Sequence, residues 1–91
     1  MDELEAARLI RDWAKRYAEK NGWRLNPDAK QLDAVIRGLA RKMVQHGERY
    51  CPCRIMTRDP DVDAKIICPC IYHTDEIRDD GHCHCNLFFR E

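Results

Sequence analysis

The chain has 91 residues, enough for one small domain whose core leaves a narrow stability margin without a cross-link or a bound metal. Charged residues make up 35% of the chain, aromatic residues make up 8%, and the formal net charge is zero, so the composition does not support a nucleic-acid-binding face. The longest apolar run, residues 66–72, is too short to span a membrane and contains a proline, and the acidic start has no secretory signal. We therefore expect a cytoplasmic protein.

Two amphipathic helices are predicted before residue 50. The first covers residues 2–20, from an N-cap at Asp2 to the Asn21-Gly22 stop. Its apolar side chains recur at helical spacing: Ala6, Ile10, Trp13 and Tyr17. The second begins at Asn26-Pro27-Asp28 and ends at Gly47. Its predicted buried stripe is Leu32, Val35, Ile36, Leu39, Met43 and Val44. We expect the two helices to pack as an antiparallel pair.

Shorter elements are predicted after Tyr50. Asp59-Pro60-Asp61 caps a helix that runs toward Ile67, and Thr74-Asp75-Glu76 opens another that ends by Gly81. Residues 86–89 form a short strand or an apolar tail that packs on the helices. The predicted fold is mainly α and forms a single domain over residues 1–91, in which residues 1–50 give helical support and residues 51–91 carry the cysteines.

All six cysteines occur in C-x-C pairs: Cys51-Pro52-Cys53, Cys68-Pro69-Cys70 and Cys83-His84-Cys85. Three structural disulfides would suit a secreted protein, which the missing signal argues against. A zinc site would favour C-x₂-C spacing, which does not occur. The third interpretation assigns four thiols to an iron–sulfur cluster and two to a redox pair. In a pair, we expect one thiol to face a buried cofactor and its partner to face outward.

The motifs C-P-C-R, C-P-C and C-H-C followed by L-F-F resemble the catalytic chain of ferredoxin–thioredoxin reductase over most of the sequence. The resemblance implies a [4Fe–4S] cluster with four ligands: Cys51, Cys68, Cys70 and Cys83. It also implies an active-site disulfide between Cys53 and Cys85. In this family, the disulfide is reduced by electrons that arrive one at a time.

The resemblance further implies separate roles for the two redox cysteines. Cys53 would attack the substrate disulfide, while Cys85 would interact with the cluster, and the apolar residues after it should draw it inward. His84 would donate and recover a proton. Arg54 is either a residue that lowers the pKa of Cys53 or an ordinary surface arginine.

The expected partners are ferredoxin or a similar small iron protein as electron donor, and a thioredoxin- or glutaredoxin-like protein as substrate. Fourteen residues separate the first two pairs and twelve separate the last two, a spacing similar to archaeal and anaerobic bacterial relatives that often lack the small variable chain. Four basic residues of the second helix are candidates for docking an acidic ferredoxin: Lys30, Arg37, Arg41 and Lys42. We expect His46 and His73 at the surface and His82 in an exposed loop. The alternative function is a non-catalytic zinc or iron–sulfur module for protein interaction.

Overall fold

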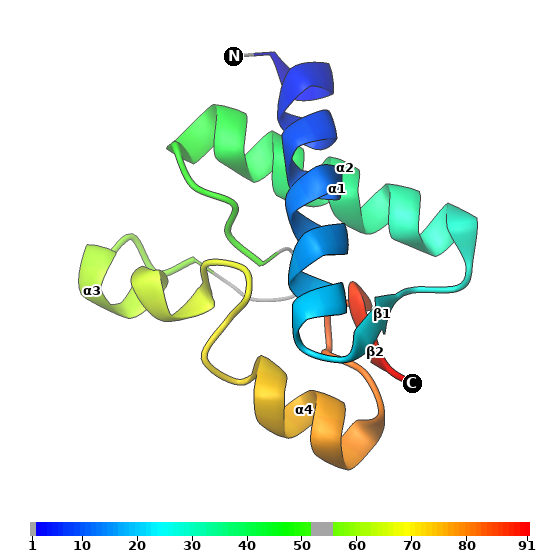
Figure 1. Cartoon of the computed structure of the whole chain (residues 1–91). Helices are drawn as coiled ribbons and strands as arrows, with labels where there is room; N and C mark the ends of the chain where they lie inside the picture. The colour runs from blue at the N-terminus through cyan, green and yellow to red at the C-terminus, as the bar shows by residue number, and fades with distance from the viewer. Residues whose placement is uncertain (1, 52–55) are drawn as a thin grey trace.

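Two long helices form the N-terminal half of the chain (Figure 1). The structure, a computed structural model, describes residues 2–51 and 56–91. Helix α1 spans Glu3–Lys20, and Asp2 caps it by accepting the Glu5 N–H at 2.7 Å. Helix α2 spans Ala29–His46 and ends at Gly47, whose φ of 80° suits a glycine. The predicted helices are confirmed.

The start of α2 differs from the prediction by two residues. Asp28, and not Asn26, caps the helix by accepting the backbone N–H groups of Lys30 and Gln31. Asn26 is buried, and its side-chain amide donates to the Asn86 carbonyl oxygen at 3.0 Å. Asn26 thus binds the C-terminal segment of the chain and does not cap α2, so the helix begins two residues later.

Helices α1 and α2 pack together but cross steeply, so the predicted antiparallel pair is wrong (Figure 1). The segment between them forms strand β1, Trp23–Leu25, which carries the chain away from α1 before α2 begins. Small and branched side chains of both helices are buried in the core: Ala6, Ile10, Ala14, Ala18, Ile36, Leu39 and Ala40. Val44, predicted in the buried stripe of α2, is exposed.

Strand β1 pairs with the C-terminal strand β2, Phe88–Arg90, and so joins the two halves of the chain. The pairing is antiparallel, with Leu25 opposite Phe88 and Trp23 opposite Arg90. The predicted strand at residues 86–89 is confirmed in part, because the observed strand begins two residues later and ends at Arg90, whereas β1 was not predicted. Phe88 is fully buried, and its ring lies 5.8 Å from the ring of Trp13 and 5.2 Å from that of Tyr17, measured between centroids.

Short helices follow in the C-terminal half. Helix α3, Pro60–Asp63, is capped by Asp59 and continues into the 3-10 helix η1, Ala64–Ile66. Helix α4, His73–Asp80, ends at Gly81, whose φ is 85°. Both helices lie within a residue or two of their predicted positions. Among the described residues, no helix is both long and apolar enough to cross a bilayer.

A pair of backbone hydrogen bonds brings residues 49–51 against residues 66–68. The Cys51 N–H donates to the Ile66 carbonyl at 2.7 Å, and the Cys68 N–H donates to the Arg49 carbonyl at 2.9 Å. Tyr50 and Ile67 form the bridge between these contacts. Cys51 and Cys68, which are 17 positions apart in the sequence, therefore enter the core side by side.

Replacement of Phe88 by alanine should lower the free energy of unfolding by about 3–5 kcal/mol, because it empties the space between α1 and the sheet. Phe89→Ala is the matched control, since this neighbouring ring is only partly buried and stacks on His82. Urea unfolding followed by circular dichroism measures both variants. An equal loss of unfolding free energy in Phe88→Ala and Phe89→Ala would show that the core is not centred on Phe88.

Candidate functional site: a buried cysteine core

The five cysteines that the structure describes are all buried. Cys51, Cys68 and Cys83 are 1–2% exposed, Cys70 is 4% exposed and Cys85 is 7% exposed. The inward position predicted for Cys85 is confirmed. Cys53 and Arg54 lie outside the described residues, so the Cys53–Cys85 disulfide and the role of Arg54 stay predictions.

Thiols from the three pairs affect one another electrostatically. A side-chain hydrogen bond with Cys51, followed by burial, raises the pKa of the Cys70 thiol. Negative charge on Cys51 also acts on Cys83, where it opposes ionisation. The structure therefore brings together cysteines from residues 51, 68–70 and 83–85, as the ligand prediction requires.

The third pair is folded into a turn. The Asn86 N–H donates to the Cys83 carbonyl at 2.9 Å, and Asn86 has a φ of 64°, a left-handed conformation that asparagine tolerates. The Cys83 and Cys85 sulfur atoms lie 3.5 Å apart. The expectation that one thiol of a pair faces outward is wrong here, because residues two apart share a side and the turn draws both sulfurs inward.

Hydrogen bonds favour the thiolate form of Cys83. The Cys85 thiol is the main cause, and together with the backbone N–H groups of Phe88 and Leu87 it lowers the pKa of Cys83 to about 6, although burial acts in the opposite direction. The Phe88 N–H lies 3.2 Å from the Cys83 sulfur. The thiolate is the form in which a cysteine attacks a disulfide or binds a metal.

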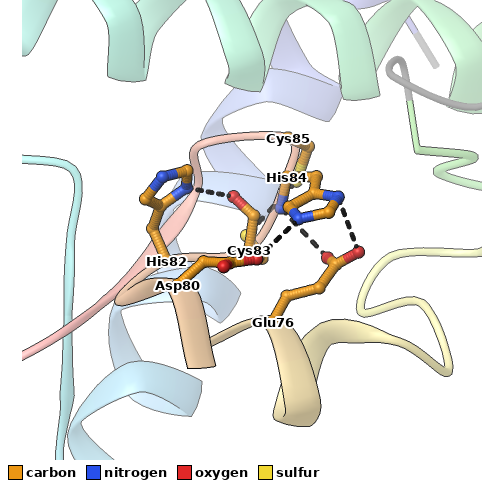
Figure 2. Close-up of polar contacts among 6 residues, drawn as sticks. All are labelled: Glu76, Asp80, His82, Cys83, His84 and Cys85. Atoms are coloured by element: carbon orange, nitrogen blue, oxygen red, sulfur yellow. Dashed lines mark hydrogen bonds and ion pairs between the residues drawn. The ribbon is translucent and has the colours of Figure 1, made fainter. Parts of the chain in front are cut away.

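His84 is held between two carboxylates of α4 (Figure 2). Its Nδ1 lies 2.9 Å from a Glu76 oxygen, and its Nε2 lies 3.0 Å from an Asp80 oxygen. The other Glu76 oxygen accepts the backbone N–H of His84 at 3.0 Å. The His84 side chain is 48% exposed, so a group with both ring nitrogens oriented lies at the surface of the turn that carries the buried thiols.

Glu76 and Asp80 are the residues of this site that the sequence analysis missed. They lie one turn apart on α4, and Glu76 is only 8% exposed. An acidic residue on the same helical stripe as Ile77 was the available signal, since a buried carboxylate requires hydrogen-bond donors.

The other histidines divide into one exposed and two partly buried residues. His46 is exposed, as predicted. His82 is partly buried, stacks on Phe89 and contacts the Cys83 carbonyl through Nδ1 at 2.8 Å, so the predicted exposed position is wrong. His73 is also partly buried, because its ring binds the Cys70 carbonyl, so the predicted surface position is correct only in part.

Two of the four basic residues expected to dock ferredoxin line one groove. Arg37 and Arg41 border a groove of about 610 Å³ between α1 and α2. Lys30 is exposed and, seven residues before Arg37, falls on the same face of α2, whereas Lys42 lies beside Met56. The charged side chains that line the groove are Glu3, Arg8, Arg11, Asp33, Arg37 and Arg41. Four arginines against two carboxylates leave the groove positively charged.

The described thiols are of the chemical type that binds an iron–sulfur cluster. Within residues 2–51 and 56–91, no three His, Cys, Asp or Glu side chains are grouped so that they could hold one ion. A tetrahedral zinc site needs four donors around one point, whereas in a [4Fe–4S] cluster each thiolate binds a different iron. Buried thiols from separate segments fit the second requirement.

The fold and the cysteine core define a small, mainly helical protein that keeps paired thiols buried beside an oriented histidine. The model of the ferredoxin thioredoxin reductase catalytic beta chain matches residues 2–91, and the chain belongs to this family. The resemblance seen in the cysteine motifs is therefore confirmed, and the family is one of oxidoreductases. No curated protein matches the chain.

Removal of the Glu76 carboxylate should destabilise the protein through the turn at His84. In Glu76→Leu, the His84 backbone N–H and ring both lose a partner, and we expect a cost of about 1–3 kcal/mol in the free energy of unfolding. Asp80→Leu is the control, because its carboxylate is 55% exposed and should cost less than about 1 kcal/mol. Similar values for the two variants would contradict a special role for the buried carboxylate.

Proposed function

We propose that this chain is a disulfide reductase that accepts electrons one at a time from ferredoxin, or from a similar small iron protein, and reduces a thioredoxin- or glutaredoxin-like protein. The observation that carries the proposal is the convergence of buried thiols from all three C-x-C segments in one core. Membership of the ferredoxin thioredoxin reductase catalytic chain family supports it.

Four cysteines would hold a [4Fe–4S] cluster: Cys51, Cys68, Cys70 and Cys83. Their burial keeps water from the ligands, and thiolates are the usual ligands of such clusters. The pKa of Cys70 is raised beside Cys51, so its thiol keeps its proton in the absence of a cluster. This is compatible with a ligand role, because cluster binding is expected to displace the protons of neighbouring thiols. When bound, the cluster would supply single electrons to the adjacent disulfide.

Cys53 and Cys85 would form the disulfide that exchanges with substrate. Its reduction takes two electrons and two protons and gives two thiols; attack on a substrate disulfide then regenerates it and releases the substrate dithiol. The 3.5 Å separation of the Cys83 and Cys85 sulfurs supports Cys85 as the member beside the cluster. Since Cys85 is buried, Cys53 is proposed to make the mixed disulfide with substrate.

His84 would move the protons of this exchange. Its ring is partly exposed at the turn that carries Cys85, and Glu76 and Asp80 fix its orientation. A proton carrier needs access to solvent, which the partly exposed ring of His84 has, and His84 is the neighbour of Cys85 in the sequence. The positive groove between α1 and α2 is compatible with an acidic electron donor.

Serine at each cysteine tests the division into four ligands and two redox thiols. Anaerobically purified wild-type protein should be brown and contain iron and sulfide, whereas a colourless zinc protein would support the interaction-module alternative. Cys51→Ser, Cys68→Ser, Cys70→Ser and Cys83→Ser should lose most of the iron, because ligation and folding are coupled. Cys53→Ser and Cys85→Ser should keep it. Full iron content in any variant of the first group would contradict that ligand assignment.

Trapping tests which redox thiol meets the substrate. Cys85→Ser should form a stable mixed disulfide through Cys53 with a thioredoxin that lacks its resolving cysteine, and Cys53→Ser should form little. Mass spectrometry identifies the crosslinked residue. A crosslink through Cys85 would reverse the two roles.

His84→Ala should keep its iron and its disulfide but turn over about 10²–10⁴-fold more slowly, since a proton carrier is lost and no ligand is. His46→Ala is the control, because this exposed residue lies outside the site. Turnover of thioredoxin is measured across the pH range with reduced ferredoxin as donor. Wild-type rates at every pH would show that His84 carries no essential proton.

A further inference from the structure

Two side chains hold the backbone of the second cysteine pair. The Arg49 Nε–H donates to the Cys68 carbonyl at 2.7 Å, and His73 Nδ1 lies 2.6 Å from the Cys70 carbonyl. A carbonyl oxygen can only accept, so Nδ1 of His73 carries the proton in this contact. The carbonyls of Cys68 and Cys70 are thus both fixed by side chains from outside the pair.

Aromatic residues of α1 hold these two side chains in turn. The Arg49 guanidinium lies 3.8 Å from the centroid of the Trp13 ring, a cation–π contact. The Tyr17 hydroxyl lies 2.9 Å from His73 Nε2, which is free to accept its proton. Trp13 and Tyr17 stack on each other with 5.5 Å between ring centroids. One turn of α1 therefore positions both contacts.

Tyr17 is also electrostatically linked to the cysteines. Burial is the main cause that raises the pKa of its hydroxyl, and negative charge at Cys68 raises it further. This coupling supports the geometric conclusion that the aromatic pair of α1 lies next to the second cysteine pair.

We propose that Arg49 and His73 are positioning residues that fix the Cys68–Cys70 segment around the cluster, and that the Arg49 charge raises the reduction potential of that cluster. This inference rests on the proposed function. Arginine stays charged under all working conditions, and a positive charge beside a ligand favours the state that holds one more electron. His73 contributes a hydrogen bond that orients the Cys70 backbone.

Substitutions at Arg49 and His73 separate the effect of the Arg49 charge on the reduction potential from the effect of both side chains on the position of the Cys68–Cys70 backbone. The variants are Arg49→Gln, Arg49→Lys and His73→Gln, and the control is Arg16→Gln, which removes a 72% exposed arginine of α1 that lies outside the groove. The measurements on the iron-loaded protein are iron content, reduction potential by redox titration, electron paramagnetic resonance of the reduced cluster, and the rate of iron loss to a chelator.

Arg49→Gln should shift the potential to a more negative value and speed iron loss. Arg49→Lys should restore most of the potential, because the charge remains, while iron loss stays faster than in wild type. His73→Gln should leave the potential close to wild type and speed iron loss roughly fivefold, which corresponds to one hydrogen bond. Arg16→Gln should match wild type in every measurement.

Other outcomes show whether the proposed function fails or only this inference about Arg49 and His73. A wild-type chain without iron would overturn both this inference and the proposed function. A wild-type chain with its cluster, but with unchanged potential and iron loss in Arg49→Gln and His73→Gln, would overturn this inference alone. If Arg49→Gln does not fold, Arg49→Lys and His73→Gln carry the test. Iron loss at the wild-type rate in both of these variants would contradict the proposal.

Discussion

The packing of Phe88 against α1 is the contact on which the cysteine core depends. Its ring is buried among the aromatic side chains of α1 and β1, while its backbone holds Cys83 from both sides. The Cys83 N–H donates to the Phe88 carbonyl at 3.0 Å, and the Phe88 N–H points to the Cys83 sulfur. One residue therefore ties the position of a proposed ligand to the hydrophobic core, so an error in core packing would also displace the site.

The cysteines themselves complete this core. A domain of this size has few large apolar side chains, and the C-terminal half contributes only a few of them, such as Ile77 and Leu87. Three cysteines, Cys51, Cys68 and Cys83, are as fully buried as those residues and belong to the same hydrophobic core. Binding of an iron–sulfur cluster by these cysteines would then stabilise the interior of the fold directly, and would couple the helices of residues 1–50 to the cysteine segments.

Local signals made much of the helical structure predictable from the sequence. Asp2, Gly47 and Gly81 act within one turn of their helices, and a pattern of a few residues is sufficient to place such ends. The segment Asn26-Pro27-Asp28 offered two capping residues, and only the distant carbonyl of Asn86 decides between them. Strand β1 was missed for the same reason, since its partner is the far end of the chain. The pairing of residues 49–51 with 66–68 depends on tertiary structure and has no local signature. The position of Glu76 beside Ile77 indicated a buried carboxylate, but its contact with His84 also depends on tertiary structure.

The turn at residues 83–85 separates sulfur chemistry from proton chemistry within three residues. Its two sulfurs point into the core, where water is excluded and thiolates are suited to metal, while the imidazole between them stays partly exposed. Both ring nitrogens are oriented by α4, and the turn is closed by Asn86. A proline between the cysteines, as in the other two pairs, would lack the backbone N–H that Glu76 accepts here. Position 84 therefore requires a residue with a backbone N–H, and the histidine ring adds two further contacts to α4, so α4 is part of the site although none of its residues is a cysteine.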